Sequence, residues 1–376
     1  MTRMLKVAVV ALGALLIALP ASAQLGGLSK AKAALDKGQK AKDAIDSLIF
    51  TDAEELALGQ QVSDKLRERY GVVQDKAVHK YVTLVGSVLA QASSRPALAW
   101  KFIVLDTDGV NAYASPGGFI HITRGALALL ENESELAGVL GHEISHVTEK
   151  HTINSIRKNN GEKILSDLGG SSNRAQLLGA FADKLYDNVF QGVYDRGDEL
   201  DADEKGAALS NKAGYAPAGL GTFLKRLDDR NKDQAERNGL FASHPDTKER
   251  IDKLAKQVTS QKLASTAIVG GRYKASITYK PLPVTSIAQV TDGASGLAGG
   301  SSKDAKPADT KSGGSKLGLG KLSALGGEKK SSSTVASAGA RGGVPDRDAK
   351  GGSNPAIVTV AVTAAEVTEF KKGIVG

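Results

Sequence analysis

One apolar stretch with three polar side chains in its middle limits the possible folds of this chain more than any other feature. The stretch is ELAGVLGHEISHVTEKH, residues 135–151, and its leucines, valines and alanines predict a buried helix. His142, Glu143 and His146 lie within it. A buried polar group is costly unless something satisfies it. The fold must therefore supply partners to these three side chains or bring them to a bound ion.

The spacing of the three polar residues is typical of a metal site. His142 and His146 are four residues apart, so on a helix they differ by about 40° and share one face. Glu143 lies about 100° around the helix from His142, where it can reach a water on the ion without being a ligand. This arrangement predicts two zinc ligands and a general base. The alternative is a pair of histidines that only form hydrogen bonds in a core.

A catalytic zinc takes three protein ligands, and the remaining candidates lie in YDRGDELDADEKGAAL, residues 194–209. Glu199 and Asp203 share a helical face there, so one can bind the metal while the other orients a ligating histidine. Acidic residues are also favoured at the start of a helix for electrostatic reasons alone. The spacing does not choose among Asp195, Asp198 and Glu199.

Three other histidines are predicted to stay away from the metal. His151 follows His142 by nine residues, which turns it to the opposite side of a continuous helix. It is expected at the surface or in the C-terminal turn, where the helix dipole favours a histidine. His79 lies beside the apolar stripe of its own helix and is expected to be exposed. His121 falls in an extended segment, where a packing role is favoured over metal binding.

The N-terminal residues differ from the rest of the chain. Residues 1–23 combine Arg3 and Lys6, a short apolar run and Ala21-Ser22-Ala23, which predicts a cleaved secretory signal. The alternative is a membrane anchor, but the apolar run is short for a span of about 20 residues. The chain has no cysteine, so it has neither disulfides nor the residue that a lipoprotein anchor needs. The predicted location is the bacterial periplasm.

Composition divides the remaining residues into segments. The stretches WKFIVLD and NAYASPGGFIHIT predict strands at 100–106 and 111–123, the second at a sheet edge, and helical periodicity dominates the rest of the centre. The predicted segments are a helical piece at 24–50, the main domain at 51–264, a short β extension at 265–290, a disordered Gly/Ser/Lys-rich linker at 291–354 and a strand–helix tail at 355–376.

The formal net charge of +8 does not extend over the predicted domain. The signal contributes +2, and residues 301–354 contribute +5 through ten basic and five acidic side chains. Residues 355–376 are neutral, which leaves +1 for everything else. A near-neutral domain argues against nucleic acid as a partner. The basic tail suggests peripheral association with anionic polymers of the cell envelope.

Four stretches resemble a known family. NAYASPGGFIHITRGAL, ESELAGVLGHEISHVTEKH, RGDELDADEKGAALSNKAGYAP and SHPDTKERI occur in this order between residues 51 and 255. Their order and spacing resemble the zinc metallopeptidase family of HtpX and the CAAX prenyl proteases, especially its soluble periplasmic branch of outer-membrane-assembly proteases. The resemblance implies a mainly helical α+β fold, with a zincin-like core, a small mixed sheet and one zinc ion per chain.

The same resemblance implies roles for single residues. It implies three zinc ligands, His142, His146 and Glu199. It makes Glu143 the general base and acid, and Asp203 the carboxylate that orients a ligand. His244 corresponds to a family histidine near the metal, which either stabilises the transition state or closes the open position. From its own neighbours, His244 before Pro245 is equally typical of a helix N-terminus.

The extended segment suggests how a substrate could bind. A polypeptide can add to an exposed strand through main-chain hydrogen bonds, and the predicted contacts are Asn111, Ala112, Tyr113, Gly117 and Gly118. The alternative is an ordinary edge strand protected by a proline. We therefore expect a zinc-dependent metalloendopeptidase of the periplasm that cleaves misfolded or envelope proteins. The alternative function is a chaperone-like assembly factor for outer-membrane proteins that cleaves rarely.

Overall fold

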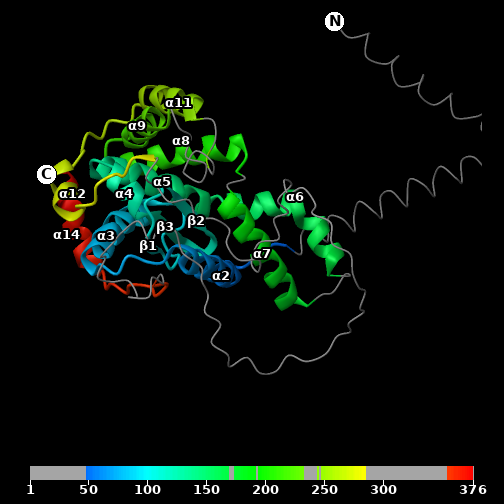
Figure 1. The fold of residues 1–376 in the computed structure, drawn as a ribbon. Coiled ribbons are helices and arrows are strands. Elements are labelled where there is room, and N and C mark those ends of the chain that lie inside the picture. The colour runs from blue at the N-terminus through cyan, green and yellow to red at the C-terminus, as the bar shows by residue number, and fades with distance from the viewer. Residues whose placement is uncertain are drawn as a thin grey trace, which may run out of the picture.

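Three short strands form a mixed sheet at the centre of the computed structural model (Figure 1). β1 (Lys101–Leu105) runs parallel to β3 (Phe119–Thr123), and β2 (Ala112–Ser115) runs antiparallel to β3. The strand order is therefore β1-β3-β2. The structure describes residues 48–168, 173–191, 194–232, 244, 247–284 and 354–375.

Helices make up most of the other described residues. In chain order they are α2 (Asp52–Tyr70), α3 (Lys76–Ala92), α4 (Arg124–Leu129), α5 (Glu133–Thr148), α6 (His151–Asp167), α7 (Arg174–Gln191), α8 (Arg196–Ala213), α9 (Gly219–Asn231), α11 (Thr247–Ser260), α12 (Gly270–Ser276) and α14 (Ala364–Val375). Several begin at a capping side chain, as at Thr51, which forms a capping box with Glu54. The predicted mainly helical α+β fold is confirmed.

The predicted extended segment 111–123 is a pair of strands joined by the 3-10 turn η1 (Pro116–Gly118). Gly117 and Gly118 have φ values of 71° and 97°, a region that favours glycine. A Cβ atom on Gly117 would also lie 2.5 Å from the Cα of Leu56 on α2. β2 lies at the edge of the sheet, whereas β3, which carries His121, is the central strand.

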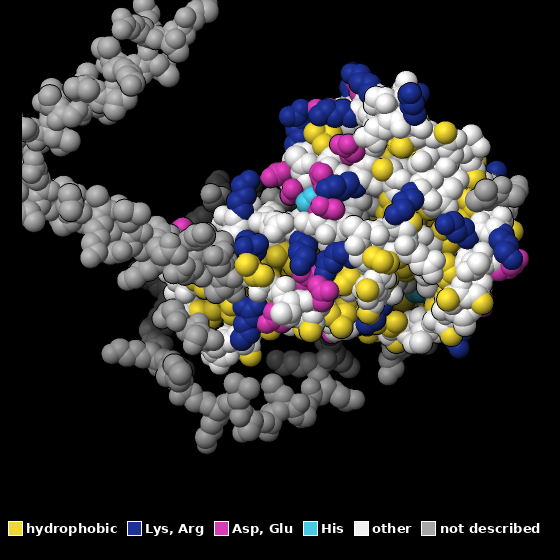
Figure 2. All heavy atoms as spheres, turned by 180° about the vertical axis from the view of Figure 1, so that it is seen from behind, with side chains coloured by type: hydrophobic (Ala, Val, Ile, Leu, Met, Phe, Trp, Pro, Cys, Tyr) yellow, Lys and Arg dark blue, Asp and Glu magenta, His cyan; other side chains and the backbone are white. Residues whose placement is uncertain are grey.

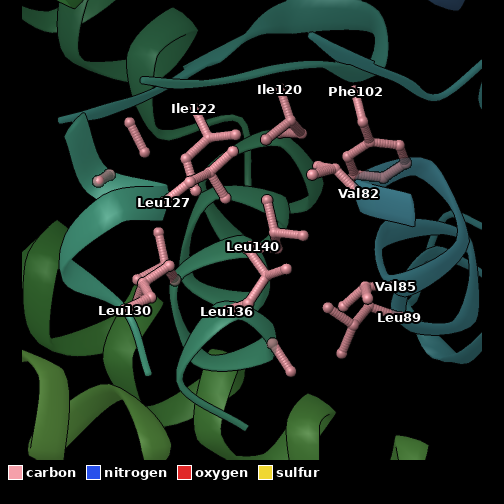
Figure 3. Packing of buried hydrophobic residues seen from close by; sticks show 14 of the residues in the cluster. Val82, Val85, Leu89, Phe102, Ile120, Ile122, Leu127, Leu130, Leu136 and Leu140 are labelled. Carbon is pink, nitrogen blue, oxygen red and sulfur yellow. The ribbon is translucent and has the colours of Figure 1, made fainter. Parts of the chain in front are cut away.

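Alternate side chains of the strands enter two separate cores, as the pleat of a sheet dictates. On one face Phe102, Ile120 and Ile122 pack against α3 and α5 (Figure 3). On the other face Ile103 and Phe119 pack with side chains of α2, α6 and α7. The sheet is therefore covered by helices on both sides, and α5 lies in the larger of the two cores.

Helix α5 is buried along almost its whole length. Asn132 caps it by accepting a hydrogen bond from the Glu135 amide at 3.0 Å. Every residue from Glu133 to Val147 is buried, including both histidines and Glu143. The helix packs against α3, α8 and α9. The apolar pattern of residues 135–151 thus predicted a buried helix correctly as far as Thr148, but not the break before His151.

Two glycines allow α5 and α8 to approach closely. A Cβ atom on Gly206 of α8 would lie 2.7 Å from the His142 amide nitrogen. A Cβ atom on Gly141 of α5 would lie 2.9 Å from the Gly206 carbonyl oxygen. Neither side chain could be added without moving one helix away from the other. This contact brings the polar residues of α8 beside those of α5.

The C-terminal residues pack onto the same domain. Residues 354–363 form neither a strand nor a helix, so the strand predicted in the tail is not observed, and α14 follows after a capping box between Thr363 and Glu366. In Figure 1, α14 lies beside α3 and α12. Val367 and Ile374 are buried, and the Arg272 guanidinium lies 3.8 Å from the centre of the Phe370 ring. The tail is thus part of the folded domain.

In the β extension predicted at 265–290, the described residues 265–284 form one isolated bridge, between Ala267 and Tyr215, and no strand. Residues 270–276 form the short helix α12, because Tyr273 turns inward and donates a hydrogen bond to the Leu127 carbonyl oxygen at 2.6 Å. Tyr273 is the one buried residue of α12, so burial here does not alternate as it would along a strand. The predicted signal at 1–23, most of the segment at 24–50 and nearly all of the linker at 291–354 lie outside the described residues.

The surface of the described part carries charges of both signs. Figure 2 shows basic and acidic side chains interspersed over the face turned away from the viewer of Figure 1. No helix in the described ranges combines the length and the apolar character needed to cross a membrane.

Candidate metal centre

The two histidines of α5 face each other across one turn of the helix. His142 Nε2 lies 3.0 Å from His146 Nε2, and both side chains are buried. Two imidazole nitrogens this close are favourable neighbours only if a proton or a cation lies between them. Burial holds the pKa of His146 well below its usual range, so the ring stays neutral and can offer a lone pair.

Helix α8 brings a carboxylate to this pair. Asp195 caps the helix, and Glu199 projects from its first turn toward α5. The Glu199 oxygens lie 3.4 Å from His146 Nε2 and 3.7 Å from His142 Nε2. Of the three acids that spacing could not separate, Asp195 is exposed and Asp198 half-buried, whereas Glu199 is 1% exposed. Only Glu199 reaches both histidines.

A third histidine completes the cluster. His244 Nδ1 lies 2.8 Å from Glu199 Oε1 and 3.3 Å from His142 Nε2. One potential ligand atom from each of His142, His146, Glu199 and His244 falls within 4.8 Å of all the others. Burial alone would lower the pKa of His244, but the carboxylates of Glu199 and Glu143 outweigh it and raise that pKa.

The geometry of these donors fits a tetrahedral metal ion. Nitrogen and oxygen ligands about 2.0–2.1 Å from such an ion lie about 3.3 Å from one another. The separations between His142, His146 and Glu199 are 3.0, 3.4 and 3.7 Å. Two imidazoles and one carboxylate are also the donor types found at catalytic zinc. The cluster therefore fits one ion of this kind.

Asp203 and Arg250 support the cluster from behind. Asp203 Oδ1 lies 2.9 Å from His142 Nδ1, although the ring is not turned fully toward that oxygen. Arg250 binds both oxygens of Asp203 at 2.8 Å and also lies 2.8 Å from Glu199 Oε2. Burial would raise the pKa of both carboxyls. Nearby positive charge outweighs this effect of burial and lowers both pKa values, so both carboxyls remain ionised. The charge comes chiefly from Arg250 for Asp203, and from His244 and Arg250 for Glu199.

Arg250 was not predicted from the sequence, although a signal exists. It lies on α11 four residues before Leu254, which is 2% exposed, so the two share the buried face of the helix. A buried arginine requires a carboxylate partner. Tyr194 was also missed: its ring stacks on the His146 ring with centroids 4.0 Å apart, and its hydroxyl lies 2.8 Å from Thr152 Oγ1.

Glu143 lies beside the cluster without joining it. Neither of its carboxylate oxygens has a hydrogen-bond partner among the described residues, and the side chain is fully buried. The nearest charged neighbour is His244, whose Nε2 lies 3.7 Å from Glu143 Oε1. Burial raises the pKa of the Glu143 carboxyl. A carboxyl whose pKa is raised in this way holds a proton more readily than an exposed one, which suits a group that both accepts and returns a proton.

Two histidine predictions are wrong. His151 is 7% exposed and touches His146, because the helix ends at Thr148 and a new helix begins at His151 after Lys150, whose φ is 58°. The rotation expected for a continuous helix does not apply across this break. His79 is 1% exposed, with Nε2 2.8 Å from the Val73 carbonyl oxygen. His121 packs as predicted, with Nε2 2.9 Å from Ser63 Oγ.

The predicted substrate residues lie in two places, and all five are buried rather than on an exposed strand. Asn111 and Ala112 lie on β2 or directly before it, where the Asn111 side chain accepts a hydrogen bond from the Ala112 amide at 2.8 Å. Tyr113 points into the second core and stacks on Tyr70. Gly117 and Gly118 pack against the backbones of α2 and residue 100. Ala114 and Ser115 of β2 and Pro116 of η1 line a small cavity that also contacts His146.

Residues 76–258 match the model of Peptidase family M48. The chain is 25% identical to the "Beta-barrel assembly-enhancing protease" of Yersinia pestis, over 57% of this chain and 46% of that protein. It is 25% identical to "Mitochondrial metalloendopeptidase OMA1" of Schizosaccharomyces pombe, over 53% of this chain and 60% of that protein. It is also 25% identical to "Metalloprotease YcaL" of Escherichia coli, over 55% of this chain and 77% of that protein. The match spans about half the length of the first of these relatives. The matched segment contains all the clustered residues, and over it the chain is similar to peptidase family M48.

Proposed function

We propose that this protein is a zinc-dependent metalloendopeptidase of the bacterial periplasm that hydrolyses peptide bonds in misfolded or envelope proteins. One observation carries the proposal: the donor atoms of His142, His146 and Glu199 face one another inside the domain at the separations that a tetrahedral ion requires. The match of residues 76–258 to a metallopeptidase family supports the same reaction class.

His142, His146 and Glu199 would hold one zinc ion per chain, and Asp203 would fix the orientation of His142. When bound, zinc supplies Lewis acidity, which polarises a peptide carbonyl and makes water a nucleophile near neutral pH. Arg250 keeps Glu199 and Asp203 ionised, so both remain ready to act as a ligand and an orienting group. These are the residues on which metal binding depends.

Glu143 would move the proton during hydrolysis. Its oxygens are free of hydrogen bonds within the described ranges and lie beside the cluster, so it can accept a proton from the attacking water. The same carboxyl can then donate that proton to the amine that leaves. Its raised pKa suits both steps, because a group that only accepted protons would not return one readily.

His244 lies where a fourth ligand would be. Its Nδ1 is 2.8 Å from Glu199 and 3.3 Å from His142 Nε2, while its Nε2 faces Glu143. In this position the side chain either donates to the oxyanion of the transition state or fills the place that a substrate needs. Replacement by alanine separates these roles: loss of activity supports the donor, and a gain supports closure.

The substrate would lie along β2. This strand is at the edge of the sheet, and Ala114, Ser115 and Pro116 line a cavity that also contacts His146. A polypeptide added as a further strand would bind through main-chain atoms, with little dependence on its sequence. Asn111 and Ala112 would extend the same edge. Tyr113, Gly117 and Gly118 would support the strand through packing.

The periplasmic location rests on the amino-acid sequence. Residues 1–23 have the pattern of a cleaved signal, and the lack of cysteine argues against a lipoprotein. The name of the Yersinia relative supports outer-membrane proteins as a substrate class. The basic residues of 301–354 would associate with anionic envelope polymers. Removing residues 291–353, which leaves the packed C-terminal tail in place, should reduce that association while peptide hydrolysis continues.

A second function is favoured by the same name, which joins assembly to proteolysis. A chaperone-like factor would bind unfolded outer-membrane proteins and cleave rarely. Glu143→Gln decides between the two, because it removes the proton-moving carboxyl and keeps the size of the side chain. If casein cleavage is lost while maturation of outer-membrane proteins continues, binding is the main function. If the wild-type protein with stoichiometric zinc cleaves no polypeptide at all, the peptidase proposal fails.

A further inference from the structure

The outer nitrogen of one clustered histidine faces another histidine rather than a carboxylate. His146 Nδ1 lies 3.0 Å from His151 Nδ1, and His151 Nε2 lies 3.1 Å from Asp201 Oδ2. The rings of His146 and His151 are 5.0 Å apart and nearly perpendicular, at 77°. His146 is 1% and His151 is 7% exposed, so bulk water does not compete for the hydrogen bonds of these ring nitrogens.

The break between α5 and α6 builds this contact. Helix α5 ends at Thr148, and Lys150 takes a left-handed conformation with φ 58° and ψ 32°. Left-handed backbone is uncommon for a residue other than glycine. Here Lys150 also forms an ion pair with the buried Glu55. The reversal brings His151 back against His146, which a continuous helix would not do.

The proton positions along this row follow from hydrogen-bond chemistry. A histidine that binds a metal through Nε2 carries its proton on Nδ1 and must donate it to an acceptor. For His146 the group in reach is His151 Nδ1, which must then be the unprotonated nitrogen of its ring. The His151 proton lies on Nε2 and is donated to Asp201. Each of these nitrogens then has one partner, because His146 donates to His151 and His151 donates to Asp201.

The two histidines of α5 are therefore supported differently. His142 meets a buried carboxylate directly, since Asp203 is 2.9 Å away and is neutralised by Arg250. His146 reaches a carboxylate only through His151, and that carboxylate is at the surface, with the Asp201 side chain 39% exposed. Lys205 lies 2.8 Å from Asp201 and 2.7 Å from Glu149. This lysine holds Asp201 in line with His151.

We propose that His151 and Asp201 are positioning residues for the metal ligand His146, acting as a carboxylate–imidazole row that sets its tautomer and ring orientation. The proposal rests on the metal site proposed above and extends it. Groups that accept a hydrogen bond from a ligating histidine fix its orientation and raise its basicity. Through this row a side chain at the surface of α8 supports a ligand in the interior of the protein.

The test measures metal affinity and the spectrum of a cobalt-substituted protein on residues 24–376. His151→Phe keeps a ring but has no acceptor nitrogen, and we expect it to weaken Zn²⁺ binding about 10- to 100-fold. His151→Asn keeps an acceptor near the Nδ1 position and should restore part of the affinity. Asp201→Ala leaves the buried ring in place and should weaken binding by less than His151→Phe. The Co²⁺ absorption bands should shift in His151→Phe.

Glu149→Gln is the matched control. It removes the second carboxylate that contacts Lys205 but leaves His151 and Asp201 unchanged, so its Zn²⁺ affinity and Co²⁺ spectrum should equal those of the wild type. The thermal midpoints of the metal-free proteins show whether each variant folds. If His151→Phe and Asp201→Ala both fold and bind Zn²⁺ with wild-type affinity, the proposal is wrong. If the wild type itself binds neither ion, the metal site proposed above fails instead.

Discussion

Arg250 binds both oxygens of Asp203 at 2.8 Å, and the two side chains are 1% and 4% exposed. The pair links α11 to α8 directly behind the clustered histidines. Arg250 also reaches Glu199, so one cation balances two carboxylates in a place that water does not enter. Without it, two negative charges would lie buried side by side, which is strongly unfavourable.

Replacing Arg250 should therefore destabilise the protein. Arg250→Met keeps the length of the side chain but leaves Asp203 and Glu199 without their cation, and removing one partner of a buried pair costs about 3–5 kcal/mol. Urea unfolding of the metal-free protein measures this loss. Arg196→Met is the control, because Arg196 pairs with Glu249 while 61% exposed, and exposed pairs contribute little. Equal losses in the two variants would contradict the role given to Arg250.

The contact between Gly141 and Gly206 sets the distance between α5 and α8. Gly206→Ala would place a methyl group 2.7 Å from the His142 amide nitrogen, and we expect it to cost about 1–3 kcal/mol and to weaken Zn²⁺ binding. Gly179→Ala on α7 is the matched control, since a Cβ atom there meets nothing within 4 Å. That variant should gain about 0.5–1 kcal/mol. A stable Gly206→Ala protein with unchanged Zn²⁺ affinity would contradict this prediction.

His121 makes the stability of the protein depend on pH. Burial lowers its pKa to about 3, whereas the unfolded chain titrates near 6.5. Between these values only the unfolded chain takes up this proton, so the free energy of unfolding should fall as the pH falls. The slope from this one group is about 1.4 kcal/mol per pH unit. In His121→Asn the slope between pH 6 and 4 should be smaller by this amount, and an identical slope would show that His121 does not titrate as stated.

The C-terminal helix should contribute to stability across the long intervening segment. Ile374 of α14 is 4% exposed, and replacing such a side chain by alanine costs about 2–5 kcal/mol. Ile357, which is 38% exposed, provides the control, and Ile357→Ala should change the unfolding free energy very little. Urea unfolding of both variants would show equal midpoints if α14 were not packed on the domain in solution.

Local patterns predicted the parts of this fold that depend on local chemistry. The buried helix predicted within residues 135–151 follows from apolar residues at helical spacing, although it ends at Thr148 and a second helix begins at His151. Residues 270–276 were predicted wrongly, because the inward turn of Tyr273 depends on Leu127, far away in the chain. Tertiary contacts decided that segment against its own pattern.

The residues of the site were likewise predictable only where local spacing decides their position. His142 and His146 could be paired from their spacing, because both lie on one helix. Glu199 could not be separated from its acidic neighbours by spacing, since that choice depends on how α8 crosses α5 at two glycines. His151 was misplaced because the left-handed Lys150 carries no local sequence signal. Contacts between elements thus determine what periodicity leaves open.

The most direct test of the central proposal is the zinc content of the purified protein, measured by mass spectrometry on residues 24–376. We expect about one zinc ion per chain in the wild type and in Glu204→Ala, which changes an exposed residue of the same helix. Glu199→Ala should lose most of its zinc while remaining folded. Stoichiometric zinc in Glu199→Ala, or none in the wild type after zinc is supplied, would contradict the metal site described here.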